Sequence, residues 1–411
     1  MSESTMMSQV KKTFSLLNQR ACSWSCSRSS SSFFTDSDSA GLVLQSHSTD
    51  VYQNLALEDW IDANVELQGR GILLLWRNRP AVVIGRHQNP WTECNLPVMR
   101  RAGIPLARRR SGGGTVFHDL GNLNLTFFTS KKAYDRQRNL KVVTDALRRL
   151  RPGLDVQATD RFDILLNGRY KISGTASRLS RKSSYHHCTL LHSADRSALS
   201  SVLRPSCPGI QSNATPSVPS PVANLLDHAP SLQWEELLGA LVQQYNTGTV
   251  FLHPKGYALS VFKRFCFIYF YLVSEFGLHS ALTDIDPTNE SMFPGVGEME
   301  VELRSWDWTF GKTPKFTMET QLELTNEQPP ARCSARLQME VKNGQIESCH
   351  LDVPVEWLPV RLSGELSSVL IGERFCPHRA AAAFSAVLRS ESGATHRRLH
   401  RLCDAMLTVM G

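Results

Sequence analysis

Residues 108–119 read Arg-Arg-Arg-Ser-Gly-Gly-Gly-Thr-Val-Phe-His-Asp, and this stretch decides how the rest of the chain is interpreted. Its three glycines permit positive φ angles and let the backbone approach a ligand closely. Its arginines carry forked donors that suit a phosphate or a carboxylate. Further along, Lys171-Ile-Ser-Gly-Thr-Ala176 places one lysine beside a small residue. Together the two segments predict an anion-binding wall that faces a catalytic lysine.

The three arginines are not expected to reach one ligand together. Successive side chains of a strand point to opposite faces, so Arg108 and Arg110 are predicted on one face and Arg109 on the other. We select Arg110, the arginine nearest the glycines, as the anion-binding residue. Lys171 is predicted to bind the carbonyl and phosphate oxygens of an acyl-adenylate and to hold the charge that develops during nucleophilic attack.

Strands and helices alternate irregularly around these motifs, which predicts an α+β fold with a mixed sheet. Asp50 is a candidate N-cap for the following helix. Two further features predict β-hairpins, one across Asn78-Arg79-Pro80 and one across Asn167-Gly168, since Asn-Gly suits a type I′ turn. Pro and Ser residues over 204–221 predict a surface-crossing or ligand-covering loop.

At 411 residues, the chain is long enough for two folded units with appendages. The first 35 residues are basic and serine-rich and contain one acid, Glu3, which is typical of a mitochondrial presequence, and we predict such a presequence over residues 1–38. We predict a catalytic domain over 42–254 and a small α+β accessory domain over 285–411. Apolar periodicity in the accessory domain predicts strands over 316–324, 335–341 and 346–351 and a helix around 380–388. Between the two domains, residues 255–284 are predicted to be an atypical aromatic insertion or a linker, and their apolar run is too short for a membrane span of about 20 residues.

The net charge of +7 is modest, and much of the arginine lies between Arg70 and Arg110. This distribution favours an acidic ligand over a nucleic acid. The ten cysteines include no Cys-x-x-Cys pair, so neither a zinc site nor a disulfide scaffold is expected. His186-His187-Cys188 is predicted to be structural, because adjacent residues of a strand face opposite sides and are not placed to ligate one metal ion.

Several motifs in order resemble the lipoate-protein ligases and lipoyltransferases, which share the biotin/lipoyl ligase fold. The resemblance implies a mixed-sheet catalytic domain followed by a small α+β domain. It extends from about Leu42 to the Pro-rich loop and resumes over 286–295 and 306–316. The motifs that carry it are Gly85-Arg-His-Gln-Asn-Pro-Trp91, residues 110–122, Arg161-Phe-Asp163, Lys171-Ile-Ser-Gly-Thr-Ala176 and His186-His-Cys-Thr-Leu-Leu191.

The resemblance also implies that the chain binds lipoyl-AMP as a substrate, without a tightly bound cofactor. Lys171 would contact the acyl carbonyl and the phosphate, and Arg161 and Thr189 would complete the adenylate site. The family often has a tyrosine where this chain has a phenylalanine in the glycine-rich wall, so only the aromatic surface is expected there. The remaining residues implied for this site are Arg110 and Phe117 in the glycine-rich wall, with Val218 and Ser220 in the covering loop.

Within the family, the leader agrees with the mitochondrial lipoyltransferases. Their activity implies transfer of a lipoyl group, from lipoyl-AMP or the lipoylated glycine-cleavage H protein, to lipoyl domains of 2-oxo acid dehydrogenase E2 subunits. We expect a monomer in the mitochondrial matrix. Three alternatives remain: a complete ligase that uses lipoate and Mg-ATP, a non-catalytic protein that docks lipoyl domains, and the related biotin ligase, whose arginine-glycine loop has a different pattern.

Overall fold

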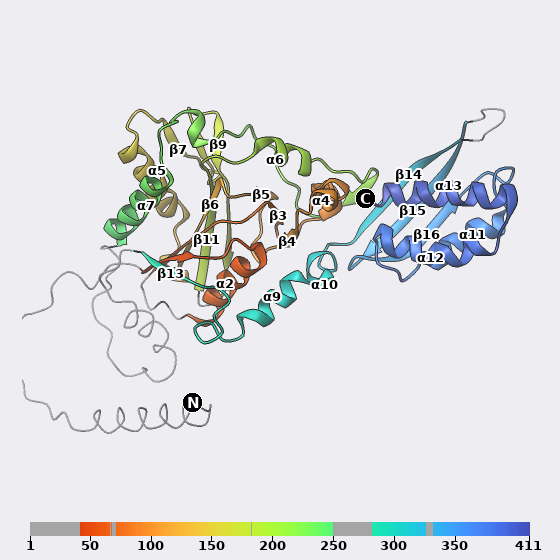
Figure 1. The fold of residues 1–411 in the computed structure, drawn as a ribbon, viewed down its shortest axis with the longest axis horizontal. Helices are drawn as coiled ribbons and strands as arrows, with labels where there is room; N and C mark the ends of the chain where they lie inside the picture. Colours follow the sequence, from red (N-terminus) through yellow and green to blue (C-terminus); the bar gives the residue numbers. More distant parts are fainter. Residues whose placement is uncertain (1–41, 66, 68–70, 182, 250–281, 326–331) are drawn as a thin grey trace, which may run out of the picture. The chain divides into compact units, whose positions relative to one another are not determined.

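The computed structural model describes residues 42–65, 67, 71–181, 183–249, 282–325 and 332–411 (Figure 1). The predicted presequence over residues 1–38 and nearly all of the predicted aromatic insertion over residues 255–284 lie outside these ranges. In the part of the chain that the structure describes, no helix is both long enough and apolar enough to cross a membrane.

A six-stranded mixed sheet forms the centre of the first domain, with the strand order β10-β11-β6-β2-β1-β13. The β1 strand is parallel to β2 and β13, and the other neighbouring pairs are antiparallel. The predicted mixed sheet is therefore confirmed. The strands are β1 (Leu42–Ser46), β2 (Ile72–Trp76), β6 (Asn122–Ser130), β10 (Thr175–Leu179), β11 (Ser183–Leu191) and β13 (Thr283–Ile285).

All five residues of β2 are apolar, so both faces of this strand must be covered, and helices bury both faces of the sheet. Leu73 and Leu75 belong to the hydrophobic cluster that contains α5 (Arg136–Leu150) and α7 (Trp234–Thr249). The alternate residues of β2 belong to a second cluster, with α2 (Val51–Asn64) and α9 (Val296–Arg304). As predicted, the Asp50 side chain caps α2, by accepting hydrogen bonds from the Tyr52 and Gln53 amides.

The first predicted hairpin is wrong, since β2 pairs with β1 and β6 and not with the next strand. That strand, β3 (Ala81–Ile84), lies in a separate three-stranded sheet of order β4-β3-β5. The buried Asn78 fixes the corner between the two sheets, because its amide group hydrogen-bonds to Asn54 and His118. The neighbouring elements are β4 (Leu106–Arg108), β5 (Val116–His118), α3 (Pro90–Glu93) and α4 (Leu96–Ala102).

The second predicted hairpin is confirmed by β8 (Ile164–Leu166) and β9 (Tyr170–Ser173), which pair antiparallel. Both turn residues have positive φ, 53° at Asn167 and 62° at Gly168, as a type I′ turn requires. With β7 (Val156–Ala158) these strands form a third sheet. The hairpin places the candidate lysine on β9.

The C-terminal sheet has the order β12-β14-β15-β16, in which β12 is Ile210–Ser212, and packs against three helices (Figure 1). Its apolar core includes Leu337 from the sheet and Leu366, Phe384 and Leu399 from the helices. These elements confirm the strands and the helix predicted after residue 315. They are β14 (Phe316–Thr325), β15 (Arg332–Lys342), β16 (Gln345–Asp352), α11 (Val360–Leu370), α12 (Pro377–Arg389) and α13 (Gly393–Val409).

The predicted domain boundary at residue 285 needs correction, because the two units exchange segments. Residues 283–309 belong to the first domain: β13 pairs with β1, and Phe293 and Val296 pack in the core around α2. In the other direction, β12 (Ile210–Ser212) leaves the first domain to pair with β14. Hydrophobic periodicity gives the elements but not their partners, which are distant in sequence. The remaining helices of the described residues are two short α-helices, α6 (Arg196–Val202) and α10 (Trp306–Thr309), and two 3₁₀ helices, η2 (Lys131–Ala133) and η3 (Leu225–Asp227).

Candidate functional site

Two adjoining cavities lie beside the glycine triplet, with volumes of about 220 Å³ and 270 Å³. The first extends inward to Trp76, His118 and Asn124. The second has an apolar wall that includes Leu199 and Leu203. They share seven lining residues, so Lys171 lies where they meet; the shared set is Thr115, Val116, Lys171, Gly174, Thr189, Ser217 and Val218.

The Lys171 side chain is only 24% exposed, and its Nζ lies 2.8 Å from Asp163 Oδ1. A Cβ atom at Gly174 would lie 3.0 Å from the lysine Cε and 3.2 Å from Nζ. The small residue predicted beside the lysine therefore leaves the space that the side chain crosses. The Lys171 backbone is held as well, because its N–H donates to Pro221 O and its carbonyl accepts from Ala223 N. The amine is thus presented to the cavities by a fixed strand.

The structure brings the predicted adenylate residues Arg161 and Thr189 to the same first cavity as Lys171. Thr189 lies on β11 and its hydroxyl accepts a hydrogen bond from Gly174 N at 3.1 Å. Arg161 precedes Phe162, whose φ of 63° is unusual for an aromatic residue. The Arg136 guanidinium lies 3.7 Å from the Phe162 ring centre, so α5 supports this turn.

The placement of Arg110 differs from the sequence expectation. Its guanidinium pairs with Asp59 at 2.8 Å and with Glu302, and it lines neither cavity. Arg109 instead lines the first cavity and donates to Gly112 O at 2.6 Å and Gly114 O at 2.7 Å. As predicted, Arg108 and Arg110 point away from Arg109: the first two reach residues between 302 and 313, and Arg109 reaches the glycine triplet. The cavity lies on the side of Arg109, whereas we selected the side of Arg110. Burial lowers the pKa of Arg109 to about 10, far above neutrality, so it remains a cation.

Arg108 holds segment 85–91 against the strand that leads into the glycine triplet. This fully buried guanidinium donates to the carbonyl oxygens of Gly85, Arg86 and Gln88. It also donates to Thr309 O at 2.8 Å. A Cβ atom at Gly85 would lie 2.2 Å from the carbonyl oxygen of the second glycine of the triplet, so only glycine fits. Segment 85–91 is therefore the support beneath the glycine wall.

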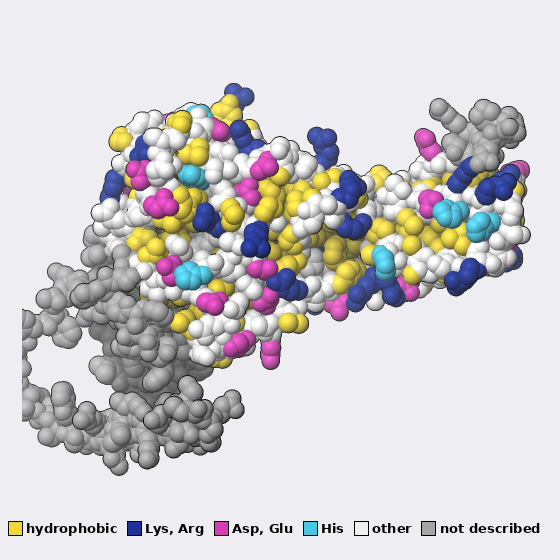
Figure 2. Space-filling view, in the orientation of Figure 1, with side chains coloured by type: hydrophobic (Ala, Val, Ile, Leu, Met, Phe, Trp, Pro, Cys, Tyr) yellow, Lys and Arg dark blue, Asp and Glu magenta, His cyan; other side chains and the backbone are white. Residues whose placement is uncertain are grey.

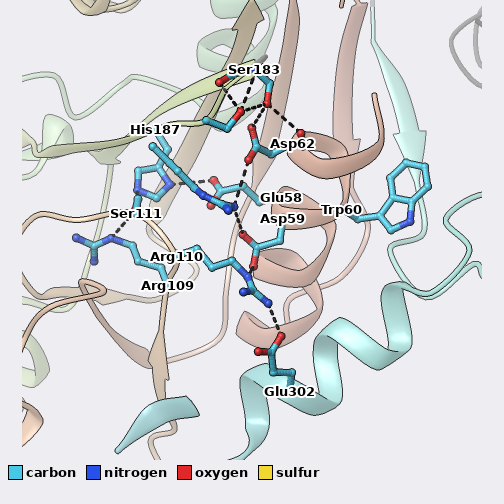
Figure 3. A network of polar contacts seen from close by, with 12 residues as sticks. Glu58, Asp59, Trp60, Asp62, Arg109, Arg110, Ser111, Ser183, His187 and Glu302 are labelled. Atoms are coloured by element: carbon cyan, nitrogen blue, oxygen red, sulfur yellow. Dashed lines mark hydrogen bonds and ion pairs between the residues drawn. The ribbon is translucent and has the colours of Figure 1, made fainter. Parts of the chain in front are cut away.

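An acidic face of α2 supports the same wall from the other side (Figure 3). Glu58 Oε1 lies 2.8 Å from His187 Nδ1, and His187 Nε2 lies 2.9 Å from Ser111 Oγ. Ser111 Oγ in turn accepts from Arg109 Nε at 3.0 Å. Sequence reasoning missed His187, which lines the first cavity. The alternation that we applied to this pair holds, because His186 faces away and bonds to Asn139 on α5.

The three other predicted residues lie around the second cavity. Phe117 on β5 is 2% exposed and lines the second cavity but not the first. Its aromatic surface therefore contributes to an apolar wall. Ser220 also lines the second cavity, and Val218 lines both. The Pro-rich segment thus covers the cavities, as one of its two predicted roles requires.

The cavity lining contains no activated thiol among the described residues. Cys188 is buried, and burial raises the pKa of its thiol to about 12, which keeps it protonated at neutral pH. Burial lowers the pKa of His118 to about 3, so that ring is neutral. Within the described ranges, no cluster of His, Cys, Asp and Glu is placed to hold a metal ion. The arrangement suits binding of an anionic, activated acyl group by cations and backbone donors.

The family model of the lipoyl protein ligase A/B catalytic domain matches residues 50–246. The chain is 46% identical over 372 residues to the mitochondrial lipoyl amidotransferase LIPT1 of Mus musculus, which covers 90% of this chain and 92% of that protein. It is 34% identical over 275 residues to lipoate-protein ligase A of Psychrobacter cryohalolentis, which covers 67% and 74% respectively.

Among solved structures, the crystal structure of P. falciparum LipL1 in complex with lipoate matches with a TM-score of 0.52. The identity is 23%, and the match covers 89% of this chain and 99% of that chain. This likeness shows the fold. Together with the family model, it confirms the predicted α+β ligase-like architecture.

Proposed function

The chain belongs to the family of lipoyl protein ligases and lipoyl amidotransferases, and from that premise we propose that it moves a lipoyl group from an activated donor to a lysine of a protein acceptor. It is an acyltransferase. The observation that carries the proposal is the position of Lys171 where the two cavities meet, with Arg161 and Thr189 beside it.

In this proposal lipoyl-AMP is the substrate and no cofactor is tightly bound. The Lys171 ammonium exchanges its ion pair with Asp163 for the acyl carbonyl and phosphate oxygens of the ligand. Arg161 and Thr189 bind the adenylate, and the glycine wall held by Arg109 lies against it. The covering segment, through Val218 and Ser220, and the aromatic surface of Phe117 complete the enclosure.

The reaction then needs positioning and charge stabilisation rather than an enzyme nucleophile. With lipoyl-AMP as the donor, the acceptor amine attacks the acyl carbon, the bond from that carbon to the phosphate oxygen breaks, AMP leaves with the electron pair, and the amine proton passes to solvent. With the lipoylated H protein as the donor, the bond that breaks joins the acyl carbon to the donor lysine nitrogen, which leaves with the electron pair and takes up a proton. The ammonium of Lys171 stabilises the negative charge on the carbonyl oxygen during attack. A buried, protonated Cys188 agrees with a route without an acyl-enzyme.

The proposed acceptors are lipoyl domains of E2 subunits in 2-oxo acid dehydrogenase complexes, and the donor is lipoyl-AMP or the lipoylated glycine-cleavage H protein. The proposed location is the mitochondrial matrix and the proposed state a monomer; the matched amidotransferases are named mitochondrial. Nucleic acid is not a proposed partner. On the face shown in Figure 2, the Lys and Arg side chains of the described residues are interspersed with Asp and Glu and form no continuous basic tract.

The test supplies the purified chain and an apo lipoyl domain with one donor at a time. The donors are lipoyl-AMP, lipoylated H protein, and lipoate with Mg-ATP. We expect the mass of a lipoyl group on the acceptor with either of the first two. A gain that also occurs with lipoate and Mg-ATP would identify a complete ligase, and no gain with any donor would overturn the proposal.

A further inference from the structure

The segment over residues 213–221, which we name the cover loop, forms one wall of both cavities. Pro216, Ser217 and Val218 line the first cavity, and residues 217–220 line the second. The end of the cover loop is tied to the catalytic strand, because Lys171 N donates to Pro221 O at 2.8 Å. Near its start, Thr215 N donates to His87 O at 3.3 Å. The middle of the cover loop is held by the hydrogen bonds of one side chain, that of Ser217.

The Ser217 hydroxyl makes three hydrogen bonds, to Glu93, Thr115 and Gln88, which is the full number that a hydroxyl can make. It donates its proton to Glu93 Oε2 and accepts from Thr115 N at 2.9 Å and from Gln88 Nε2 at 3.1 Å. A hydroxyl has one donor and two acceptor positions, so all three are occupied. The Ser217 amide also donates, to Glu93 Oε1 at 3.2 Å. One residue of the loop therefore meets both oxygens of one carboxylate.

Glu93 is the last residue of α3, and it is 8% exposed. Among the described residues, no Lys, Arg or His nitrogen lies within ion-pair distance of its carboxylate. Its partners are neutral: Ser217, and the Thr115 hydroxyl, which lies 2.9 Å from both Glu93 Oε2 and Gln88 Oε1. A buried carboxylate is costly unless it is hydrogen-bonded, and such charge-assisted bonds are stronger than neutral ones. The stability of the carboxylate thus depends on the loop lying in this position.

We propose that Glu93 is a positioning residue that keeps the cover loop closed over bound lipoyl-AMP, and that it acts through Ser217. The inference rests on the proposed function. Thr115 and Ser217 line both cavities, so the contact lies at the junction where the mixed anhydride would be held. Closing the loop there keeps the ligand bound and keeps water from the anhydride, which hydrolyses when it is exposed.

The Glu93→Gln variant tests the carboxylate with little change in volume. An amide has one acceptor oxygen, so its NH₂ group would meet either the donating Ser217 amide or the donating hydroxyls. We expect lipoyl-AMP to dissociate from this variant about tenfold faster or more, the size of a lost charge-assisted hydrogen bond. KM for lipoyl-AMP is expected to rise in proportion, and kcat is expected to remain within about twofold, because Lys171 keeps its strand and its partners.

The experiment measures lipoyl-AMP dissociation, its hydrolysis to lipoate and AMP, and the separate KM and kcat, using the full chain. The variants are Glu93→Gln, Ser217→Ala and the double variant, with Glu298→Gln on the exposed surface of α9 as a control. If the two residues act through each other, the double variant is no faster in dissociation than the more affected single variant. Additive effects, or unchanged dissociation in Ser217→Ala, would overturn the proposal.

The wild-type measurement separates this inference from the function on which it rests. Wild-type binding of lipoyl-AMP with unchanged dissociation in the variants refutes the role of Glu93 alone. A wild type that does not bind lipoyl-AMP refutes the proposed function as well. Thermal unfolding of each ligand-free variant is recorded beside the kinetics, and if Glu93→Gln does not fold, Ser217→Ala decides the question. An equal loss of kcat and gain of KM would indicate general damage to the fold and would also refute the role.

Discussion

The wall of the first cavity and the C-terminal sheet bury side chains of opposite character. In the wall Arg109 and His118, and behind it Glu58, are each 3% exposed or less. In the C-terminal sheet and its helices the buried described residues are apolar except Ser363, and the ion pair of Glu319 and Arg336 lies on the surface. Apolar burial stabilises a fold without further requirements, whereas a buried charge must be matched by partners. The difference indicates that the wall is built for a ligand.

The sharpest test of this contrast replaces Lys171, the one cationic side chain among the described residues that lines both cavities. Lys171→Ala is expected to lower the rate of lipoyl transfer about 100-fold or more, the effect of removing one group that stabilises the developing oxyanion. The measurement is the rate of mass gain on an apo lipoyl domain. Stability is expected to change little, since the lysine is partly exposed and its strand is held by backbone bonds.

The matched control is Lys141→Ala, which removes an exposed lysine whose partner is Asp145 in the same helix. It is expected to transfer lipoyl groups at the wild-type rate. Undiminished transfer by Lys171→Ala would break the assigned role, and so would a loss of activity that follows from unfolding of the variant.

The second prediction concerns the wall itself. Arg109→Met is expected to lower the free energy of unfolding by about 3 kcal/mol, because a buried cation is removed and the carbonyl oxygens that it serves are left without donors. Chemical denaturation measures the change. Arg101→Met, at an exposed position on α4, should stay within about 0.5 kcal/mol of the wild type. Similar losses in the two variants would contradict the contrast between wall and surface.

The apolar half of this comparison could be predicted from the sequence, and the polar half only in outline. Periodicity gave β14, β15, β16 and α12, because apolar burial leaves a regular pattern along each element. The Asn167-Gly168 turn followed from local φ preferences in the same way. Alternation correctly placed Arg109 opposite its neighbours. These features depend on residues close together in the chain.

The errors arose where the deciding partner is distant in sequence. Arg110 was selected for the ligand because it is the arginine nearest the glycines. Its actual partners, Asp59 and Glu302, lie far away on either side along the chain. The boundary at 285 failed because β13 completes a sheet that begins at residue 42. The same limit hid His187, whose role depends on Glu58 of α2. Partner identity, rather than local structure, is what single-sequence reasoning lacks here.

The third prediction concerns how the free energy of unfolding depends on pH, which should be set by the buried His186 and His118 of the first domain and not by exposed histidines of the C-terminal domain. Burial, and then the charge of Arg136, lowers the pKa of His186 to about 3, below the value near 6.5 in an unfolded chain. Because the folded state binds this proton less tightly, the stabilising contribution is complete above about pH 6.5 and is lost as the pH falls toward 3. By pH 5 the expected loss is about 2 kcal/mol.

Urea unfolding between pH 5 and 7 checks this expectation, with His186→Gln as the variant. Removal of the buried imidazole should reduce the dependence of stability on pH by about half, because the buried His118, whose pKa is also lowered to about 3, is still present. His400→Gln, which removes an exposed histidine of α13, should keep the wild-type profile. A wild-type slope in His186→Gln would show that the acid sensitivity arises elsewhere.

The smallest effect is expected on the surface of the C-terminal sheet. Arg336 donates to Glu319 from Nε at 2.9 Å, and both side chains are about half exposed. Solvent and salt screen such a pair, and holding two long side chains in one geometry costs conformational entropy. Arg336→Gln should therefore move the thermal midpoint by no more than about 2 °C and leave lipoyl transfer unchanged. A larger shift would mean that charge also stabilises this sheet, and the contrast with the cavity wall would then lose its basis.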